Sequence, residues 1–515
     1  MAFVQRIIMK RYTLLLIIVL IGLFLRVNQL GTPNLTVDEA VSTALAKMNL
    51  SQLMQAQPAL ELNPPLYFVI LHYWVMLFGD SEFALRFLSV VFGVLAIPMT
   101  FAVGRQLFDE EVGMLGALIL ALSAFNVQYS QQSRMYSLMV LLTLLSMYFF
   151  LRLLRKSSRA ISAGYVLVTT LLLYTHIYGL IVLLAQNIYL AALLFLSREK
   201  TVRLRQWIVL QAIVVGLFAL WIPVFMSHIS LVTSGFWVPR PTLSAFVNTF
   251  ITYAGTIIAF PGTLLFIVFL GLAVLSLFTY TKVTGSMDWK ALLNSLGGYS
   301  WNVHITNVAS VTLLVVWMLS LNVVPFVISF YSTPIYYTRY TIAASVALYL
   351  LVAGGVRNIN WRYAKIAVIA VIVTLSAVNL QGYYNATTSD NTIEQAHKAF
   401  SYVIENAKSG DVVIVYPGLW KYVWDYYENG TNVDVMPFPA TFYYHGLSWE
   451  NQNTIKNIKE LQSDVNGHSR VWFIRAGTSS FTPFVQALNT SNESYESKSS
   501  QAYGDYTVIL LEKRN

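Results

Sequence analysis

The sequence predicts a polytopic α-helical membrane protein with a C-terminal α/β domain. The chain has 515 residues, of which 56% are apolar and only 11% are charged, and its mean hydropathy is +0.59. Ordinary soluble proteins are about 25% charged, so this composition excludes a soluble globular protein. The chain has no cysteine, which excludes disulfides, thiolate catalysis and cysteine metal sites.

Long apolar segments predict the membrane-spanning helices. A helix needs about 20 apolar residues to cross a bilayer, and about eleven segments reach or approach that length. They lie near 12–30, 84–105, 111–126, 136–153, 161–177, 179–197, 207–226, 259–280, 306–328, 341–356 and 364–380. The first has basic flanks and no convincing cleavage site, so we expect a retained helix rather than a signal peptide. The apolar segment Leu66–Phe78 is too short to span and follows Pro64-Pro65, so we expect a helix lying on the membrane surface.

The basic residues predict the orientation of these helices. With a cytoplasmic N-terminus, seventeen Lys and Arg residues of the membrane part fall in inner loops and five in outer loops. This bias explains the net charge of +9, so we expect no nucleic-acid partner. The protein is expected in the plasma membrane, with the first loop, residues 31–83, and the C-terminal part on the outer face.

Residues 381–515 change in character and predict a soluble extracytoplasmic α/β domain, distinct from the membrane domain of residues 1–380. They carry 14 of the 24 acidic residues. The segments Val412–Tyr416, 471–474 and 506–511 are typical of buried strands. The segments 392–407 and 454–465 have the periodicity of amphipathic helices.

Few acidic residues are available for chemistry on the outer face. Between Val112 and Ser389 the only acids are Glu199 and Asp288, and both are predicted on the inner face. The outer candidates within the membrane part are Asp38, Glu39, Glu61, Asp80 and Glu82. Thr36 and Glu39 also fit a capping box at a helix N-terminus. A purely structural role for Asp38-Glu39 is therefore an alternative of equal weight to a catalytic role. Asp80 and Glu82 follow a glycine and are expected to be solvated or paired with Arg86.

Arginines and aromatic residues recur in the outer loops. Arg134 lies between Tyr129 and Tyr136, Arg240 follows Phe236-Trp237, and Arg339 lies between Tyr336 and Tyr340. Arginine matches phosphate oxygens with two parallel hydrogen bonds, so these segments are candidates to bind an anion. The alternative is that these arginines and aromatics only anchor helix ends at the interface. His176, at the end of a predicted crossing, is more often a structural hydrogen-bonding residue than a ligand.

Several of these segments, in this order, resemble the polyprenyl-phosphate-dependent glycosyltransferases of the GT-C superfamily, above all the glycosyltransferase family 39 and protein-mannosyltransferase-like group. The matching stretches are Val37-Asp38-Glu39-Ala40, Asn63-Pro64-Pro65-Leu66-Tyr67, Phe78-Gly-Asp-Ser-Glu-Phe-Ala-Leu-Arg86, Tyr129-Ser-Gln-Gln-Ser-Arg134-Met-Tyr136-Ser-Leu138, Tyr174-Thr-His176, Phe236-Trp237 and Pro334-Ile-Tyr336 with Arg339-Tyr340. The resemblance covers most of residues 12–380, whereas the C-terminal part matches only loosely.

The resemblance implies an inverting transfer of a sugar, with a hexose such as mannose favoured, from a polyprenyl or dolichyl phosphate to a protein, lipid or glycan. It implies that Asp38 is the general base and that Glu39 shapes the catalytic site. Arg339, helped by Arg134 and Arg240, would stabilise the leaving phosphate. The other residues expected to bind substrate are Glu61, Tyr136, His176, Trp237, Tyr336 and Tyr340.

The chain departs from the family at Gln132, where relatives commonly have an acid. Glutamine keeps hydrogen bonding but loses the charge, which puts a two-carboxylate site in doubt and gives Asp38 and Glu61 more weight. Asp38, Glu39, Glu61 and His176 could supply divalent metal ligands, but their spacing is not that of a metal motif and we predict no metal.

Two other functions fit a membrane protein of this composition. A transporter or flippase for lipid-linked sugars would be expected to carry ionisable groups near the bilayer midplane. The predicted crossings contain no Asp or Glu once their ends are excluded, which favours catalysis at the membrane surface. A scaffold that acts through its C-terminal domain would leave the Asp38 loop and the outer arginines without a purpose.

Overall fold

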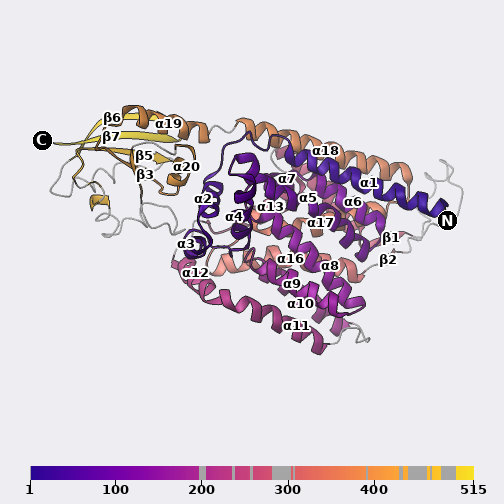
Figure 1. Cartoon of the computed structure of the whole chain (residues 1–515). Helices are drawn as coiled ribbons and strands as arrows, with labels where there is room; N and C mark the ends of the chain where they lie inside the picture. The colour runs from indigo at the N-terminus through magenta and orange to yellow at the C-terminus, as the bar shows by residue number, and fades with distance from the viewer. Residues whose placement is uncertain are drawn as a thin grey trace.

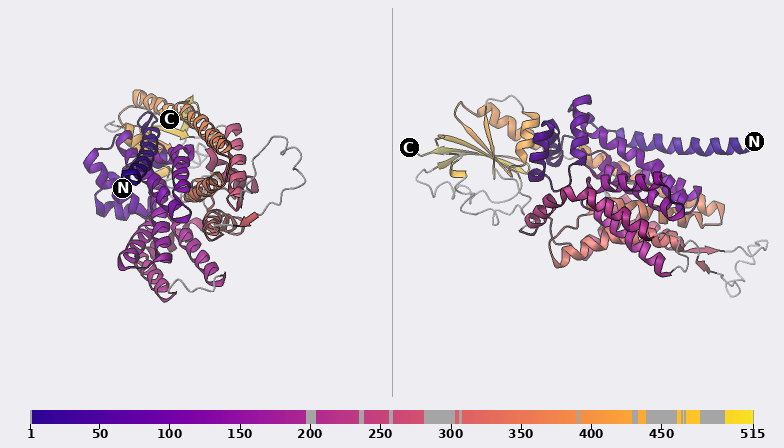
Figure 2. Two further views of the ribbon diagram at one scale, coloured as in Figure 1. Left: turned by 90° about the vertical axis from the view of Figure 1, so that its right-hand side faces the viewer. Right: turned by 60° about the horizontal axis from the view of Figure 1, so that its bottom comes forward.

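The protein is a bundle of long apolar helices with a small mixed sheet at one end. The computed structural model describes residues 2–196, 204–234, 238–255, 259–280, 303–305, 308–389, 392–428, 433–438, 461–463, 465, 467–476 and 495–514. The two chain ends lie at opposite ends of an elongated molecule (Figures 1 and 2). The short helices of the first loop lie between the bundle and the sheet (Figure 1). This architecture confirms the predicted fold class.

Every segment predicted to cross the membrane coincides with a helix. The bundle helices are α1 (Ala2–Val27), α5 (Glu82–Leu107), α6 (Glu110–Leu122), α7 (Ala124–Ser130), α8 (Tyr136–Arg155), α9 (Arg159–Leu173), α10 (Gly179–Leu196), α11 (Leu204–Phe218), α12 (Ile222–Ser234), α13 (Leu243–Gly255), α14 (Ala259–Leu275), α16 (Val308–Tyr331), α17 (Ile342–Arg357) and α18 (Arg362–Ser389). A short 3₁₀ turn at Ala219–Trp221 precedes α12, and another at Thr338–Thr341 precedes α17. An antiparallel pair of strands, β1 (Phe278–Tyr280) and β2 (Val303–Ile305), lies beyond α14.

The number of membrane crossings stays a prediction. Among the described residues, 6 helices are long and apolar enough to cross a membrane, or 7 if α6 and α7 form one bent span. Other apolar helices are shorter, including α4, α9 and the described part of α14. Hydropathy and length identify helices of the right kind, but they do not decide how each short helix lies in the bilayer.

One predicted crossing is two helices rather than one. Helices α6 and α7 meet at Ser123 at an angle of 61°. The Ser123 side chain accepts a hydrogen bond from the backbone N–H of Asn126 at 3.2 Å, which caps α7 and starts a new helix axis. The bend turns the chain that follows, with Ser133 and Arg134, toward the first loop.

Three helices occupy the first loop. They are α2 (Val37–Lys47), α3 (Leu50–Leu60) and α4 (Leu66–Phe78). The α4 helix has the predicted limits and begins after Pro65, where the missing N–H of proline costs no intrahelical bond. Helix α4 packs on α2 and α5, and the N–H of Leu66 donates to the carbonyl of Tyr174 at 3.0 Å.

The C-terminal elements form a five-stranded mixed sheet in the order β4-β3-β5-β7-β6. The predicted strands appear as β3 (Val412–Tyr416), β5 (Arg470–Ala476) and β7 (Tyr506–Lys513), and the first predicted helix as α19 (Thr392–Asn406). Three elements were not predicted: β4 (Asp434–Pro437), β6 (Tyr495–Tyr503) and α20 (Trp420–Tyr427). The second predicted helix, 454–465, lies mostly outside the described residues. Strand β3 runs parallel to β4 and β5, and β7 runs antiparallel to β5 and β6.

The sheet domain packs directly on the first loop. Its apolar core on the α19 and α20 side includes Ala40 of helix α2. The Tyr427 hydroxyl accepts a hydrogen bond from the N–H of Leu35 at 2.8 Å, and the Tyr426 hydroxyl donates to the carbonyl of Asp80 at 2.9 Å. The domain therefore braces the segment that carries Asp38. Helix α18 continues past residue 380 to Ser389, and the proposed domain boundary at 380/381 stays a prediction.

Glycine allows two bundle helices to pack closely. A Cβ on Gly355 of α17 would collide with the backbone oxygen of Leu272 in α14 and lie 2.6 Å from its carbonyl carbon. Small residues at such contacts are typical of packed membrane helices. Gly271, on α14 itself, has nothing within 4 Å of such a Cβ.

We expect Gly355→Ala to destabilise the protein by about 1–3 kcal/mol, the usual range for overpacking, because neither backbone can yield cheaply. The matched control, Gly271→Ala, adds a methyl group to open space and should not destabilise. Thermal unfolding of the two variants in detergent measures the difference. Equal melting temperatures for both would contradict this account of the α14–α17 contact.

Candidate active site

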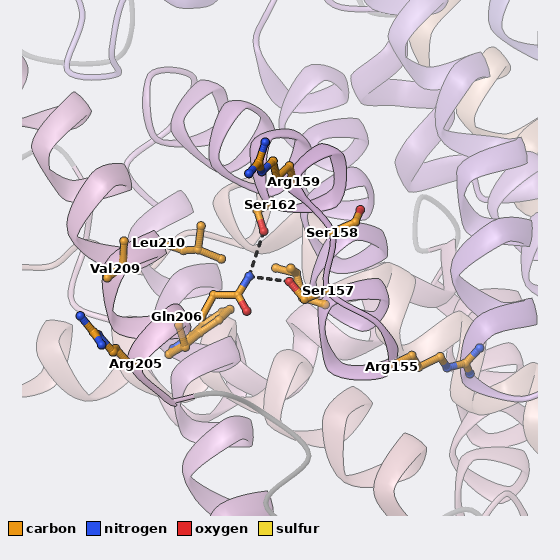
Figure 3. A pocket seen from close by; sticks show the side chains of 11 residues that line it. Arg155, Ser157, Ser158, Arg159, Ser162, Arg205, Gln206, Val209 and Leu210 are labelled. Atoms are coloured by element: carbon orange, nitrogen blue, oxygen red, sulfur yellow. Dashed lines mark hydrogen bonds between the residues drawn. The ribbon is translucent and has the colours of Figure 1, made fainter.

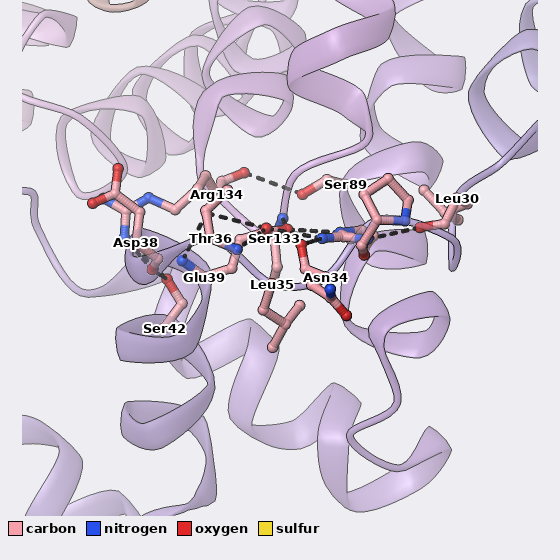
Figure 4. Close-up of polar contacts among 12 residues, drawn as sticks. Leu30, Asn34, Leu35, Thr36, Asp38, Glu39, Ser42, Ser89, Ser133 and Arg134 are labelled. Atoms are coloured by element: carbon pink, nitrogen blue, oxygen red, sulfur yellow. Dashed lines mark hydrogen bonds and ion pairs between the residues drawn. The ribbon is translucent and has the colours of Figure 1, made fainter. Parts of the chain in front are cut away.

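The first turn of α2 presents two neighbouring acids to different surroundings. Thr36 caps the helix: its hydroxyl accepts from the N–H of Glu39 at 3.4 Å, and its own N–H donates to the Glu39 carboxylate at 3.0 Å. The predicted capping box, the structural alternative to a catalytic role for these two acids, is therefore present. The two side chains point in different directions (Figure 4): Glu39 contacts Arg86, whereas Asp38 contacts Arg339.

Glu39 is fully occupied by a buried ion pair with Arg86. Two guanidinium nitrogens of Arg86 donate to the two carboxylate oxygens at 2.8 and 3.0 Å, and the N–H of Ser133 adds a third bond at 2.9 Å. The side chains are only 3% and 1% exposed. The remaining N–H groups of Arg86 donate to the carbonyls of Leu30, Pro33 and Asn34. Arg86 thus pairs with Glu39 and not with Asp80, which contacts Lys47 at 2.8 Å.

These contacts set the charge of Glu39. Burial alone would raise the pKa of its carboxyl group, but the charge and hydrogen bonds of Arg86, with the N–H groups of Ser133 and Thr36, lower the pKa below its ordinary value. Glu39 is therefore an ionised anchor, and both of its carboxylate oxygens already accept hydrogen bonds.

Arg134 and Glu61 form a second buried pair at 2.5 Å. The other terminal nitrogen of Arg134 donates to the carbonyl of Asp38 at 3.2 Å and to the Ser42 hydroxyl at 3.0 Å. The second Glu61 oxygen accepts from the backbone and side-chain amides of Asn63. Both residues were predicted to bind substrate, and the structure shows them joining the loop before α4 to α2.

Asp38 makes the third and most open pair. Its carboxylate lies 3.0 Å from Arg339, and the two side chains are 30% and 19% exposed. Burial favours a raised pKa for Asp38, but the positive charges of Arg134 and Arg339 and the hydrogen bond from Arg339 lower it below the ordinary 3.8. Asp38 is therefore ionised at neutral pH and can be reached from outside, as a general base requires.

Aromatic rings surround the Arg339 guanidinium. It lies 5.8, 5.1 and 5.5 Å from the ring centres of Tyr136, Tyr337 and Tyr340, which is within range of cation–π attraction. These rings limit its motion and hold its charge beside Asp38. The predicted Asp38, Tyr136, Arg339 and Tyr340 are therefore brought together from three separate parts of the chain.

Two buried hydrogen-bond donors near Arg339 have no partner among the described residues. The Tyr178 N–H donates to Nδ1 of His176 at 3.1 Å, so the neutral ring carries its proton on Nε2. That Nε2 and the Tyr136 hydroxyl are both buried without a hydrogen-bond partner. The His176 ring lies 6.1 Å from that of Tyr136 and 5.5 Å from that of Tyr340. Buried polar groups are usually satisfied, so these two are candidates to meet a ligand.

Two predicted residues, Tyr336 and Arg240, are not brought to this cluster. The Tyr336 hydroxyl donates to Thr249 at 2.8 Å and lies in the contact between α13 and α16. Arg240 is exposed and makes no ion pair in the described part of the chain. Trp237 lies outside the described residues.

Arg26 is a buried polar residue that was not among the predicted site residues. Its guanidinium is buried inside the bundle, where it donates to Ser130 and to the carbonyls of Gly22, Leu120 and Ala121. A charged residue within an apolar segment was the available signal. Arg26 joins α1 to the α6–α7 bend and is structural.

Among the described residues no three His, Cys, Asp or Glu side chains gather closely enough to hold a metal ion. One cavity, of about 840 Å³, lies at the other end of α8, where Arg155, Arg159 and Arg205 contribute to its wall (Figure 3). Helix α8 is 20 residues long, or about 30 Å at 1.5 Å per residue, so this cavity is remote from Asp38. Residues 197–203, which lead into α11, lie outside the described residues, and we assign no function to this cavity.

The comparisons with known proteins concern the fold and one part of the chain. Residues 62–226 match the family described as dolichyl-phosphate-mannose-protein mannosyltransferase. The chain resembles ArnT from Cupriavidus metallidurans in the apo state (TM-score 0.63) and bound to undecaprenyl phosphate (TM-score 0.60), each at 11% identity over 96% of this chain and 97% of that chain. It is also similar to the oligosaccharyltransferase AglB from Archaeoglobus fulgidus, at 12% identity and TM-score 0.48 over 90% of this chain and 69% of that chain. No curated protein sequence matches significantly.

We expect Arg86→Ala and Glu39→Gln each to destabilise the protein by about 3–5 kcal/mol, because each leaves a buried partner without its counter-charge. Thermal unfolding in detergent measures the loss. The control is Lys47→Ala, which breaks an exposed pair and should cost less than about 1 kcal/mol. If all three variants unfolded at the wild-type temperature, the Glu39–Arg86 pair would not be the anchor of the first loop.

Proposed function

We propose that the chain is a membrane glycosyltransferase of the GT-C type that transfers a sugar from a polyprenyl or dolichyl phosphate to a hydroxyl group at the Asp38–Arg339 pair. The family-model match over residues 62–226 and the likeness of the fold to ArnT support this proposal. A hexose such as mannose is favoured, and the acceptor is a protein, lipid or glycan. The observation that best supports this proposal concerns the five first-loop acids: among them, Asp38 alone contacts an arginine and is also exposed to solvent. The relative bound to undecaprenyl phosphate supports a lipid-phosphate donor.

The proposed step inverts the anomeric configuration. The Asp38 carboxylate takes the proton of the acceptor hydroxyl while the oxygen of that hydroxyl attacks the anomeric carbon. The bond from that carbon to the phosphate oxygen breaks, and its electron pair leaves with the lipid phosphate. The Arg339 guanidinium would stabilise this developing charge, as fixed donors do in preorganised sites. The unpartnered His176 Nε2–H and Tyr136 O–H would donate to the same group.

The Asp38–Arg339 contact couples donor binding to base strength. Arg339 lowers the pKa of Asp38, which makes the free carboxylate a weak base. A donor phosphate at Arg339 would offset part of the positive charge and raise the pKa of Asp38. The base would then gain strength when a donor is in place, which disfavours wasteful proton uptake in the empty site.

We further propose that this site faces the extracytoplasmic side of the plasma membrane. The basic residues support that orientation, because they concentrate in the loops at the other end of the bundle.

Asp38→Asn is expected to lower transfer by at least about 100-fold, the lower range for loss of a general base, while leaving the folded protein intact. Radiolabelled polyprenyl-phosphate sugars, tested as a panel with purified wild type and variant, give the rates. Asp80→Asn is the matched control because it removes an exposed first-loop carboxylate that contacts only Lys47. Full turnover by Asp38→Asn would remove the proposed mechanism, and donor binding without transfer by wild type would favour a flippase.

Arg339→Ala is expected to raise the KM for the donor by about tenfold or more, since a hydrogen bond to a charged group is worth about 1.5–3 kcal/mol. The KM for the acceptor should change little. The acid limb of the pH–rate profile should also move to higher pH, because one of the charges that lower the pKa of Asp38 is gone. Arg362→Ala, an exposed arginine at the start of α18, is the control. An unchanged donor KM would argue against a phosphate role for Arg339.

A further inference from the structure

A second polar cavity lies on the far side of the Glu39–Arg86 pair from Asp38. Its volume is about 310 Å³, at the lower end of the range of about 300–1,000 Å³ for small-molecule sites. Its walls come from the segment after α1, from α7 and the turn that follows it, and from the end of α18. The amides of Gln29, Asn34, Gln128, Gln131 and Gln132 line it, and we call it the amide pocket.

The amide pocket has no unpaired charge in its described wall. Glu39 and Arg86 are its charged lining residues, and they neutralise each other through two hydrogen bonds. All the N–H groups of Arg86 already have acceptors. A phosphate or a metal ion would therefore find no counter-charge, and the wall fits a neutral ligand.

Several amide groups in the pocket are free to bind. Gln131 is fixed, because its amide donates to the carbonyls of Arg26 and Asn28 at 3.0 and 2.7 Å. The side chains of Gln29, Gln128 and Gln132 make no hydrogen bond within the described part of the chain. Each side-chain amide offers donors and an acceptor, which matches hydroxyl groups that both donate and accept. The buried Tyr383 adds an aromatic surface to the same wall.

The backbone at Gln29 is a second, independent sign of a ligand site. Its φ is 59°, and it is the one non-glycine residue with positive φ among those described. Left-handed conformations of residues other than glycine are uncommon and cluster where a ligand is bound. This conformation places Gln29 in the wall of the amide pocket.

We propose that the amide pocket binds a neutral, hydroxyl-rich sugar unit of the acceptor. The inference rests on the proposed function, because it makes the acceptor a glycan whose reacting hydroxyl lies at Asp38. Thr36 and Glu39, both in the pocket wall, flank Asp38 within one turn of α2. A glycan that passes over the exposed Thr36 would have one sugar in the pocket while the reacting sugar meets the Asp38 carboxylate.

The test measures binding of neutral methyl glycosides and disaccharides of mannose, glucose and galactose to the purified full-length protein by saturation-transfer NMR. At least one should bind wild type. Its affinity should fall about tenfold in Gln128→Leu and in Gln132→Leu, as expected for the loss of a neutral hydrogen bond. Gln55→Leu makes the same chemical change at an exposed position on α3 and should bind like wild type. Both tested glutamines are only partly buried, so neither change disturbs a core.

The outcomes separate this inference from the proposed function. Asp38→Asn should bind the glycoside normally while losing transfer. Failure of every glycoside to bind, or equal affinity in wild type and both glutamine variants, would overturn the amide-pocket assignment even if Asp38→Asn abolished transfer. Normal transfer by Asp38→Asn, with glycoside binding still sensitive to Gln128 and Gln132, would instead overturn the Asp38 mechanism and the acceptor role that depends on it.

Discussion

The buried ion pair between Glu39 and Arg86 positions the first loop on the bundle. Arg86 lies near the start of α5. Its guanidinium donates hydrogen bonds to three carbonyls of the chain leading into α2 and to both carboxylate oxygens of Glu39. The N–H of Ser133 binds the same carboxylate. Because a buried charge without a partner is costly, these three parts of the chain cannot separate without a large penalty. The position of Asp38, one residue before Glu39, follows from this constraint.

Two adjacent acids of the same charge therefore have different tasks. Glu39 is enclosed and has no oxygen to offer a ligand, whereas Asp38 remains partly exposed beside a single open arginine. Burial and partners decide the division, since both carboxyl groups are held ionised by neighbouring arginines. The C-terminal sheet domain contributes by packing on α2 through α20 and Ala40. A domain that matches its relatives only loosely in sequence thus supports the turn that carries the candidate base.

Much of this arrangement could be predicted from the sequence because apolar length and turn residues act locally. The helix at Leu66–Phe78 was predicted with its limits, and each long apolar segment is helical. The bend at Ser123 and the pairing of Arg86 with Glu39 were not, because they depend on partners distant in the chain. For the same reason Arg339, Tyr136 and His176 gather near Asp38, whereas Tyr336, close to Arg339 in sequence, bonds to Thr249 instead. Of the predicted segments, those that carry Tyr136, His176 and Arg339 meet near Asp38, and contacts between distant parts of the chain determine which of their side chains do so.

We propose that the lipid phosphate of the donor binds at Arg339, opposite Asp38. A structure of the full chain with a polyprenyl phosphate bound would test this binding site. We expect phosphate oxygens within hydrogen-bond reach of the Arg339 guanidinium, with His176 Nε2 and the Tyr136 hydroxyl directed at the same group and Asp38 open on the side away from the lipid. A phosphate bound instead among Arg155, Arg159 and Arg205, with Arg339 still paired only to Asp38 and its neighbouring rings, would contradict it.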